Sequence, residues 1–244
     1  MLNVLTSQLE AFGRLPPADR QLLDDLIRER RVVNSRVDLI REGDPTKNVY
    51  LILEGFACRY KILPNGKRHI VAYLVPGDFC DLHVFILKRM DHSLGTLSRC
   101  TVAEIPRDRV LEIAARPAIG RALWWATLVD EATLREWLIN IGGRSAERRV
   151  GHLLCELLMR LEAVGLTNGN SYELPLTQEE LGDTMGITTV HVNRVIQRLR
   201  RKGLITLKGS KLAICDIKGL RDLSGFNPNY LHLDEQNGHK EPTV

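Results

Sequence analysis

The sequence lacks the features that mark membrane proteins and the common enzyme classes. No apolar run approaches the roughly 20 residues that a membrane-spanning helix needs, so no membrane association is expected. The motifs G-x-x-x-x-G-K-[ST], G-x-S-x-G and H-E-x-x-H are absent, and the glycines of the PGD and PNG segments fall in predicted turns. We therefore predict that the protein is not an enzyme and has no catalytic residue and no metal site.

Cysteine is scarce and scattered. The five cysteines are odd in number and include no Cys-x-x-Cys pair, which argues against a disulfide framework or a zinc knuckle. The N-terminal stretch MLNVLTSQLEAFGRL also lacks the pattern of a secretory signal, so a cytoplasmic protein is expected. Reduced, buried thiols are predicted for Cys58, Cys80, Cys100, Cys155 and Cys215.

Acidic residues are absent between Asp183 and Asp216, whereas seven arginines and lysines fall there. With 244 residues, 44% hydrophobic and 26% charged, the chain is typical of one or two globular domains. Its net charge is only +4, so the positive excess belongs to the C-terminal third. A surface of one sign suits the phosphates of nucleic acid. The alternative explanation is the solvated face of an ordinary amphipathic hairpin.

The segment 176–205, LTQEELGDTMGITTVHVNRVIQRLRRKGLI, is typical of two short helices joined by a glycine-containing turn. Thr177 and Glu180 suit a capping box at the start of the first helix, and Gly186 suits its end. Thr188 is the expected cap of the second helix. Core positions recur there at helical spacing: Val192, Val195, Ile196 and Leu199. The pattern predicts a helix-turn-helix that reads DNA.

The other faces of the second helix carry residues that suit base recognition. Arginine and asparagine have bidentate groups that match the major-groove edges of guanine and adenine. The stretch LITLKGSKLAI then alternates as two short strands, which predicts a wing that touches the DNA backbone. The predicted DNA-binding residues are Thr188, Thr189, Val190, His191, Asn193, Arg194, Gln197, Arg198 and Lys208.

Residues 32–105 show a different pattern, with short alternating stretches between regularly spaced glycines. Apolar and β-branched stretches such as NVYLILEG and RHIVAYLVPGD favour strands, and Pro64-Asn65-Gly66 favours a hairpin turn. We predict a small barrel or sandwich here. A helical segment from Ser7 to Arg30 is expected to pack against it.

A long helix without caps is predicted from Ala118 to Ile141, and its apolar residues form two stripes. The barrel can cover one stripe and the same helix of a second subunit the other, which predicts a twofold homodimer. Burial of both stripes within one chain is the alternative. We assign the dimer contact to a first stripe of Ile119, Ala122, Ala126, Val129, Thr133 and Trp137. The second stripe consists of Trp124, Leu128, Leu134, Leu138 and Ile141.

Gly142-Gly143 follows this helix and precedes the amphipathic stretch RSAERRVGHLLCELLMRLEAVG. Because adjacent glycines weaken a helix, the pair predicts a hinge between a sensor half and a DNA-binding half. Near the C-terminus, the residues from Phe226 to Leu233 are expected to dock on the winged domain. The polar residues from Asp234 onward are expected to be disordered.

A strand-rich domain ending in PGDF, a long helix and the segment TQEELGDTMGITTVHVNRVIQRLRRKGLI together resemble the Crp/Fnr family of bacterial regulators, over roughly residues 9–221. The resemblance implies an α+β chain with a double-stranded, jelly-roll-like β-roll, a dimerisation helix and a winged helix-turn-helix. It also implies a palindromic DNA operator with half-sites about 34 to 36 Å apart, and RNA polymerase as a partner. The implied divisions are a sensor domain (1–116), dimerisation helix and hinge (117–142), DNA-binding domain (143–222) and tail (223–244).

The resemblance also gives expectations for single positions. In the family's recognition helix a glutamate and an arginine commonly read bases, and here Val190 and Arg194 occupy these positions. Members that bind cyclic AMP carry a Gly-Glu pair after GDF and an arginine further on. This chain has Asp81 as its nearest acid and Met90 near the arginine position, with Arg89 beside it. The missing charge partners argue against cyclic AMP as the effector.

The effector is therefore left unidentified. An iron–sulfur cluster is disfavoured because the first cysteine is Cys58, and haem because no second ligand accompanies His83 or His92. The apolar side chains of residues 84–87 could simply fill the pocket. The candidate effector pocket consists of Gly77, Asp78, Phe79, Asp81 and Arg89.

The sequence thus predicts a dimeric, sequence-specific regulator of transcription whose sensor domain moves the DNA-binding domains about the hinge. Two alternatives stay open. One is a sensor or scaffold whose partner is a protein, and the other is a regulator that responds to a cyclic nucleotide.

Overall fold

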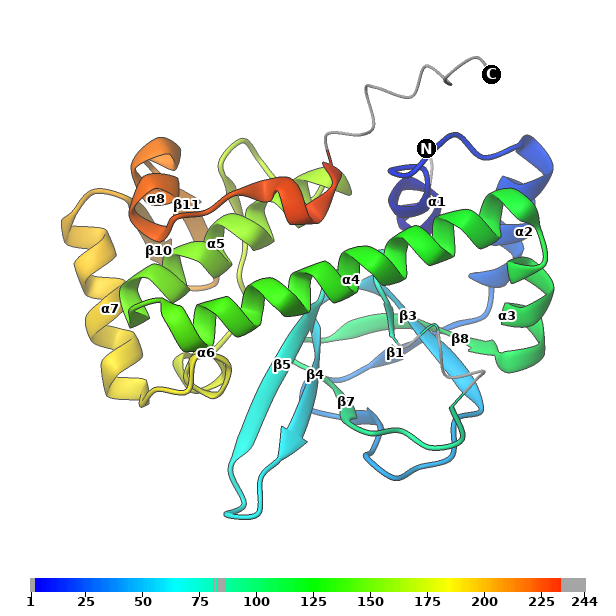
Figure 1. Ribbon diagram of the computed structural model, residues 1–244, viewed down its shortest axis with the longest axis horizontal. Helices are drawn as coiled ribbons and strands as arrows, with labels where there is room; N and C mark the ends of the chain where they lie inside the picture. The colour runs from blue at the N-terminus through cyan, green and yellow to red at the C-terminus, as the bar shows by residue number, and fades with distance from the viewer. Residues whose placement is uncertain (1–2, 81, 83–86, 234–244) are drawn as a thin grey trace.

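The computed structural model describes residues 3–80, 82 and 87–233, which form a β-roll, a long helix and a second α/β unit (Figure 1). The predictions made for Asp81, for His83, for residues 84–86 and for the tail from Asp234 lie outside the described residues. In the described part of the chain, no helix is both long and apolar enough to cross a membrane.

The strands of the β-roll form two antiparallel sheets in the described residues, with the orders β1-β8-β3-β6 and β2-β7-β4-β5. Their apolar side chains meet between the sheets, and the predicted turn at Gly66 joins β4 to β5. The β-roll fold class predicted for this half is confirmed. The strands are β1 (Arg30–Val33), β2 (Asp38–Ile40), β3 (Asn48–Glu54), β4 (Ala57–Ile62), β5 (Arg68–Leu74), β6 (Phe79–Cys80), β7 (Ser93–Thr96) and β8 (Cys100–Pro106).

The N-terminal segment, predicted to be helical from Ser7 to Arg30, forms two helices. Helix α1 spans Val4–Leu9 and α2 spans Pro17–Leu26. The break falls before the Pro16-Pro17 pair, because a residue that precedes proline disfavours helical backbone whereas Pro17 suits a first helical position. Both helices add apolar side chains to the β-roll core: Leu5, Leu9 and Leu23.

Helix α4 (Pro117–Gly143) follows α3 (Arg107–Ala114) and runs along the β-roll to the second α/β unit (Figure 1). Its first apolar stripe faces inward. Ile119 and Ala122 are fully buried in the core shared with the β-roll and α1 to α3. The dimer contact predicted for these two residues is wrong, because the chain's own β-roll covers them. The rest of the stripe is partly buried: Ala126, Val129, Thr133 and Trp137.

The second stripe of α4 faces solvent. Trp124 is 69% exposed and Leu138 is 73% exposed, and the three other residues of the stripe are at least 40% exposed. A single chain therefore does not bury both stripes, contrary to the alternative. The uncovered residues form an outer apolar surface that we call the α4 stripe: Trp124, Leu128, Leu134, Leu138 and Ile141.

The junction after α4 lies just beyond the predicted hinge. The helix continues through Gly142 and Gly143 and ends at Arg144, whose backbone is extended. Ser145 then caps α5 (Ala146–Ala163). The amphipathic pattern predicted for this helix is present, yet residues 150–158 are all buried, including the polar His152 and Glu156. Helices α4, α6, α7 and α8 and strand β9 surround it, so its polar side chains face other parts of the protein rather than solvent.

The second unit is a winged helix-turn-helix, as predicted. Helices α6 and α7 pack against α5, and a sheet of order β10-β11-β9 forms the wing. Strand β9 was not predicted, and it gives the wing a third strand. The elements are β9 (Ser171–Glu173), α6 (Gln178–Met185), α7 (Thr189–Arg201), β10 (Ile205–Lys208), β11 (Lys211–Ile214), α8 (Ile217–Ser224) and the 3-10 helix η2 (Pro228–Leu231).

Candidate nucleic-acid interface and interdomain cavity

The turn between α6 and α7 is built from local hydrogen bonds and a close backbone approach. The Thr177 hydroxyl accepts from the backbone N–H of Glu180 (3.1 Å), and the Glu180 carboxylate accepts from the N–H of Thr177 (2.7 Å). Gly186 ends α6 at a φ of 64°, in the left-handed region. A Cβ on Gly182 would lie 2.7 Å from the carbonyl oxygen of Ile187, so glycine lets the two helices come close.

Helix α7 has one buried face and one exposed face. The hydroxyl of Thr188 caps the helix by accepting from the N–H of His191 (3.3 Å). The predicted core residues are at most 3% exposed: Val192, Val195, Ile196 and Leu199. The residues of α7 predicted to contact DNA all lie on its exposed face, where Val190 is 62% exposed, and the two predicted residues outside the helix, Thr188 and Lys208, are exposed as well. Figure 1 places α7 at the edge of the molecule, away from the β-roll.

The exposed face is positively charged. No ion pair joins Arg194, Arg198 or Lys208 to a carboxylate of the described residues. Lys202 differs, because its ammonium group lies 2.8 Å from the Glu147 carboxylate at the start of α5. One cation of the predicted basic run thus pairs with a carboxylate of the same chain at the surface, while those on the recognition face and the wing are left available for phosphates.

The wing places two lysines beside each other. Lys208 and Lys211 are register partners in the β10–β11 hairpin, and both are exposed. The hydroxyl of Ser210, at the hairpin turn, donates to the Glu173 carboxylate of β9 (2.6 Å), which ties the turn to the third strand. The hairpin that carries these lysines is therefore supported by β9, which pairs with β11.

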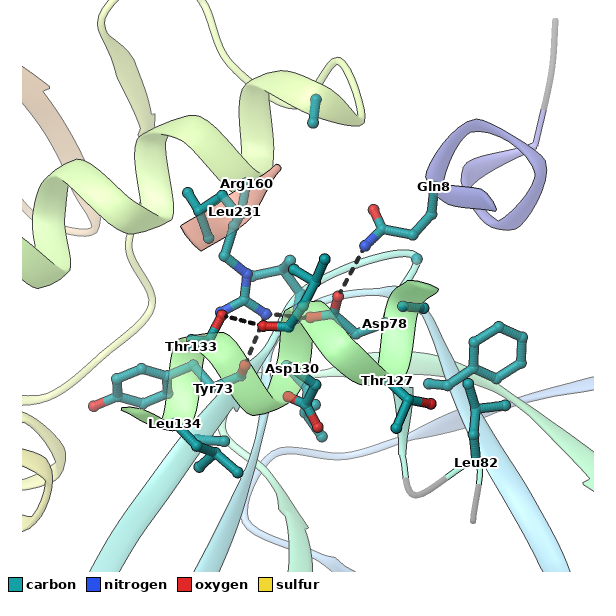
Figure 2. Close-up of a pocket in the computed structure, with 18 of the residues that line it drawn as sticks. Gln8, Tyr73, Asp78, Leu82, Thr127, Asp130, Thr133, Leu134, Arg160 and Leu231 are labelled. Atoms are coloured by element: carbon teal, nitrogen blue, oxygen red, sulfur yellow. Dashed lines mark hydrogen bonds and ion pairs between the residues drawn. The ribbon is translucent and has the colours of Figure 1, made fainter. Parts of the chain in front are cut away.

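A cavity of about 90 Å³ lies between β5, the PGD turn, α4 and α5 (Figure 2). Gly77, Asp78 and Phe79 of the predicted effector pocket line it. Arg59 also lines the cavity. It donates from one Nη to the Asp130 carboxylate of α4 (2.7 Å) and from the other to the carbonyl oxygen of Phe79 (3.2 Å). The cavity is thus bounded by charged groups that already pair with each other.

Arg89 lies away from this cavity, so its placement in the effector pocket is wrong. Its guanidinium donates to the carbonyl oxygen of Gly43 (2.8 Å) on the surface of the β-roll. The backbone of Arg89 pairs with Pro45, which lies in the same β2–β3 loop as Gly43, and this pairing holds the arginine there. Met90 packs in the core, and Leu87, which was expected to fill the pocket, is 46% exposed. The structure therefore does not bring an arginine of this segment to the cavity.

Asp78 is committed to contacts within the protein. Its carboxylate accepts from the backbone N–H of Val75 (2.7 Å) and pairs with Arg160 of α5 (2.5 Å), and Gln8 approaches its other oxygen (Figure 2). Burial raises the pKa of Asp78, and the Arg160 guanidinium opposes that shift. Asp78 therefore joins the sensor domain to the DNA-binding unit rather than presenting a free carboxylate.

Sequence reasoning missed Arg160 and its neighbour Glu156. Glu156 is fully buried on α5 and accepts hydrogen bonds from the Trp137 indole (3.1 Å) and the Tyr230 hydroxyl (2.8 Å). Burial raises its pKa, against the effect of the Arg160 guanidinium. The available signal was the pair of charged residues four positions apart within the apolar run LLCELLMRLEA.

The sensor domain also touches the helix-turn-helix directly. The Tyr73 hydroxyl on β5 hydrogen-bonds with Thr184 and donates to the carbonyl oxygen of Glu180 (3.3 Å) on α6. Beside this contact, Arg68 pairs with Asp183 (2.8 Å). A change in the β-roll can therefore reach α6 without passing through α4.

The cysteines form no reactive cluster in the described part of the chain, and no group of metal ligands is found there. Burial raises the pKa of Cys58 to about 12, so its thiol is protonated at neutral pH. Cys215 is exposed, which corrects the prediction that all five thiols are buried.

Comparison with known proteins gives two domain matches. Residues 30–116 match the family model of the cyclic nucleotide-binding domain, and residues 148–223 match that of the Crp-like helix-turn-helix domain. The transcriptional activator protein FnrA of Stutzerimonas stutzeri is 24% identical over 208 residues, 85% of each chain. The nitrogen fixation regulation protein FixK of Bradyrhizobium diazoefficiens is 29% identical over 189 residues, 77% of this chain and 78% of its own.

Among solved structures, FixK2 from Bradyrhizobium japonicum superposes with a TM-score of 0.72 at 22% identity. The match covers 80% of this chain and 96% of that chain. The likeness extends over the β-roll, the long helix and the winged unit together, so the order and the fold of the three parts are shared.

Proposed function

Because this chain belongs to the Crp/Fnr family of transcriptional regulators, we propose that it binds operator DNA as a homodimer and reads each half-site with α7. The observation that carries this proposal is the exposed face of α7, where Arg194 and Asn193 stand clear of any described carboxylate. These groups match the hydrogen-bonding edges of guanine and adenine. The protein acts by binding rather than catalysis, in the cytoplasm where the chromosome lies, with RNA polymerase as the expected protein partner.

The contacts divide into base readout and phosphate binding. Arg194 and Asn193 donate to base edges, and Val190 offers an apolar surface to a thymine methyl group. His191, Thr189 and Gln197 lie on the same face. Arg198 and Lys208 face the phosphates on either side of the groove, where they set affinity rather than sequence preference.

The α4 stripe supports the dimer. Five large apolar side chains exposed along one helix are the surface that a second copy of the same helix covers. Packing of α4 against its twofold mate places the two α7 helices on the same side of the dimer. Half-sites about one helical turn, or 34 to 36 Å, apart are then expected.

The cavity supports an effector smaller than a nucleotide. At about 90 Å³ it is smaller than the roughly 150 Å³ that holds a benzene molecule. A cyclic phosphate would also have to displace Asp130 from Arg59 or Asp78 from Arg160. The indole N–H of Trp125 lines the cavity and finds no acceptor among the described groups, so a small molecule with an acceptor oxygen suits the site.

The experiment that tests this function is retention of sheared bacterial genomic DNA by the purified, ligand-free protein at about 0.15 M salt, where non-specific binding is weak. Sequencing of the retained fragments is expected to show an inverted repeat with half-sites one turn apart. The Asn193→Ala, Arg194→Ala variant, changed only at exposed positions, is the matched control and should lose this enrichment. Equal retention of all fragments by both proteins would contradict the proposal and favour a protein partner.

A further inference from the structure

The chain continues past the helix-turn-helix match, which ends at residue 223, and folds back over the molecule. After α8, the residues 226–233 cross α5 and reach α4, with η2 lying alongside the long helix (Figure 1). We call this segment the C-terminal strap. Leu231 is 2% exposed and Phe226 is 7% exposed, so the strap is a packed part of the structure.

The strap is fastened by Tyr230. Its hydroxyl donates to the buried Glu156 carboxylate (2.8 Å), which also accepts from the indole of Trp137 on α4 (3.1 Å). The Glu156 carboxylate on α5 thus accepts one hydrogen bond from the strap and one from the long helix. The ring of Tyr230 stacks on His152 of α5, with centroids 5.8 Å apart, and Phe226 meets the same imidazole edge-on at 5.0 Å.

The network reaches the sensor domain through Arg160. This guanidinium lies 3.4 Å from Glu156 and 2.5 Å from Asp78, and it donates to the carbonyl oxygen of Tyr73 (3.0 Å) on β5. Figure 2 shows Arg160 between Asp78, Tyr73 and Leu231. Leu231 and Leu233 of the strap line the cavity itself, so a molecule bound there would touch the strap.

The covalent connection between α4 and α5 gives little control of their angle. It consists of Arg144 and Ser145, both with extended backbone, so non-covalent contacts must set the angle. The Glu156 carboxylate is placed to do so, because its donors come from both sides of the junction. Hydrogen bonds to a buried charged group are among the stronger ones available to a protein.

We propose that Tyr230 is a positioning residue: through Glu156 and Arg160 it fixes the DNA-binding unit at one angle to α4 and the sensor domain, and so sets the half-site spacing that the dimer accepts. The proposal rests on the DNA-binding function above. The strap, and not only the dimer helix, then selects operators. A ligand in the cavity would act on this angle through Leu231 and Leu233.

The test compares Tyr230→Phe with the unsubstituted protein and with a control variant, Tyr60→Phe. The control removes a hydroxyl that donates a hydrogen bond to Asp38 (2.7 Å) on the β-roll. The first readout is hydrogen–deuterium exchange of residues 139–149 in the absence of DNA. Loss of a hydrogen bond to the buried carboxylate should speed exchange there about tenfold in Tyr230→Phe but not in Tyr60→Phe. Trp137→Phe, which removes the α4 donor to the same carboxylate, should show the same effect.

The second readout uses operator duplexes whose half-sites are moved apart by one base pair. The full-length protein should discriminate against the altered spacing, and Tyr230→Phe should lose about tenfold of that discrimination while keeping its base preferences. Truncation after Leu233 leaves the strap in place and should match the full-length protein. Unchanged exchange and unchanged spacing preference in Tyr230→Phe would overturn the proposal. Faster exchange without any operator binding would instead count against the DNA-binding function alone.

Discussion

Arg194 and Lys208 are both exposed cations of the DNA-binding unit, yet their replacement by alanine is expected to affect DNA binding differently. Arg194→Ala takes away a bidentate donor to a base, so the preference for one base pair in each half-site should fall by about 1 to 3 kcal/mol. Competition binding with operators mutated at each position measures this. Equal weakening on every sequence would show that Arg194 contacts only phosphate.

Lys208→Ala is the comparison on the wing. It should weaken binding to all sequences alike and reduce the slope of log affinity against log salt by about one charge per half-site. Fluorescence anisotropy titrations over a range of salt concentrations measure the slope. If the slope stays unchanged, the wing does not touch the DNA.

His152 should make the stability of the protein depend on pH. It is fully buried, and burial together with the Arg144 cation lowers its pKa to about 4, with Glu136 opposing the shift. Because an unfolded histidine titrates near pH 6.5, the unfolded chain takes up its proton at higher pH than the folded chain. The stabilisation is present in full above about pH 6.5 and is lost as the pH falls toward 4.

Urea unfolding at pH 7.5 and pH 5 measures this effect. The native protein should lose about 2 kcal/mol more than His152→Gln over that range. Comparison of the two proteins isolates His152, because burial raises the pKa of Asp78 and Glu156 and so gives those two groups the opposite sign in both proteins. An identical pH dependence in the two proteins would show that His152 stays unprotonated, or protonates equally, in both states.

The sequence predicted the exposed face of α7 well, since helical spacing alone separates Val192 and Val195 from Arg194. It did not predict the network of Glu156 and Arg160. A charged pair four positions apart on a helix is usually solvated, and only the packing of other elements around α5 shows that Glu156 is fully buried and that the Arg160 side chain is only 16% exposed.

The sequence predicted the length of α4 better than it predicted which face of the helix is buried. The pattern of α4 indicated two apolar stripes, and both exist, but which one faces the β-roll depends on how the helix is rotated in the fold. The hinge was placed at Gly142-Gly143 because glycine weakens helices. The helix nevertheless continues through both residues, and the break at Arg144 is set by the cap of the next helix at Ser145.

The exposed α4 stripe is expected to form the dimer contact. Leu138→Glu places a charge where two apolar helices should meet, and in a twofold dimer the change occurs twice. Loss of two buried leucines should weaken association by about 3 to 6 kcal/mol. Sedimentation equilibrium measures the dissociation constant.

Leu111→Glu, at a leucine that is 43% exposed on α3, is the matched control and should leave the dimer intact. The secondary structure of both variants should equal that of the native chain, because both leucines are exposed in the single chain. A Leu138→Glu protein that stays dimeric would show that the subunits meet through another surface.

Two sets of contacts connect the sensor domain to the DNA-binding unit. One runs from β5 to α6 through Tyr73 and Thr184, and the other from Asp78 through Arg160 to α5. Neither could be predicted from the sequence, because each pairs residues more than 80 positions apart whose types are common on any surface. The domain order was predictable because hydrophobic period and turn spacing are local properties.

If α7 reads bases in both half-sites, a change at Val190 should alter the sequence that the protein selects. Selection from a random DNA library should be run on the native protein and on Val190→Glu, an exposed substitution that leaves the core of the helix-turn-helix untouched. A glutamate accepts a hydrogen bond from cytosine, whereas valine favours a thymine methyl group. The motif should change from thymine to cytosine at one position in each half-site and nowhere else. An identical motif from the two proteins, or a change in only one half-site, would contradict it.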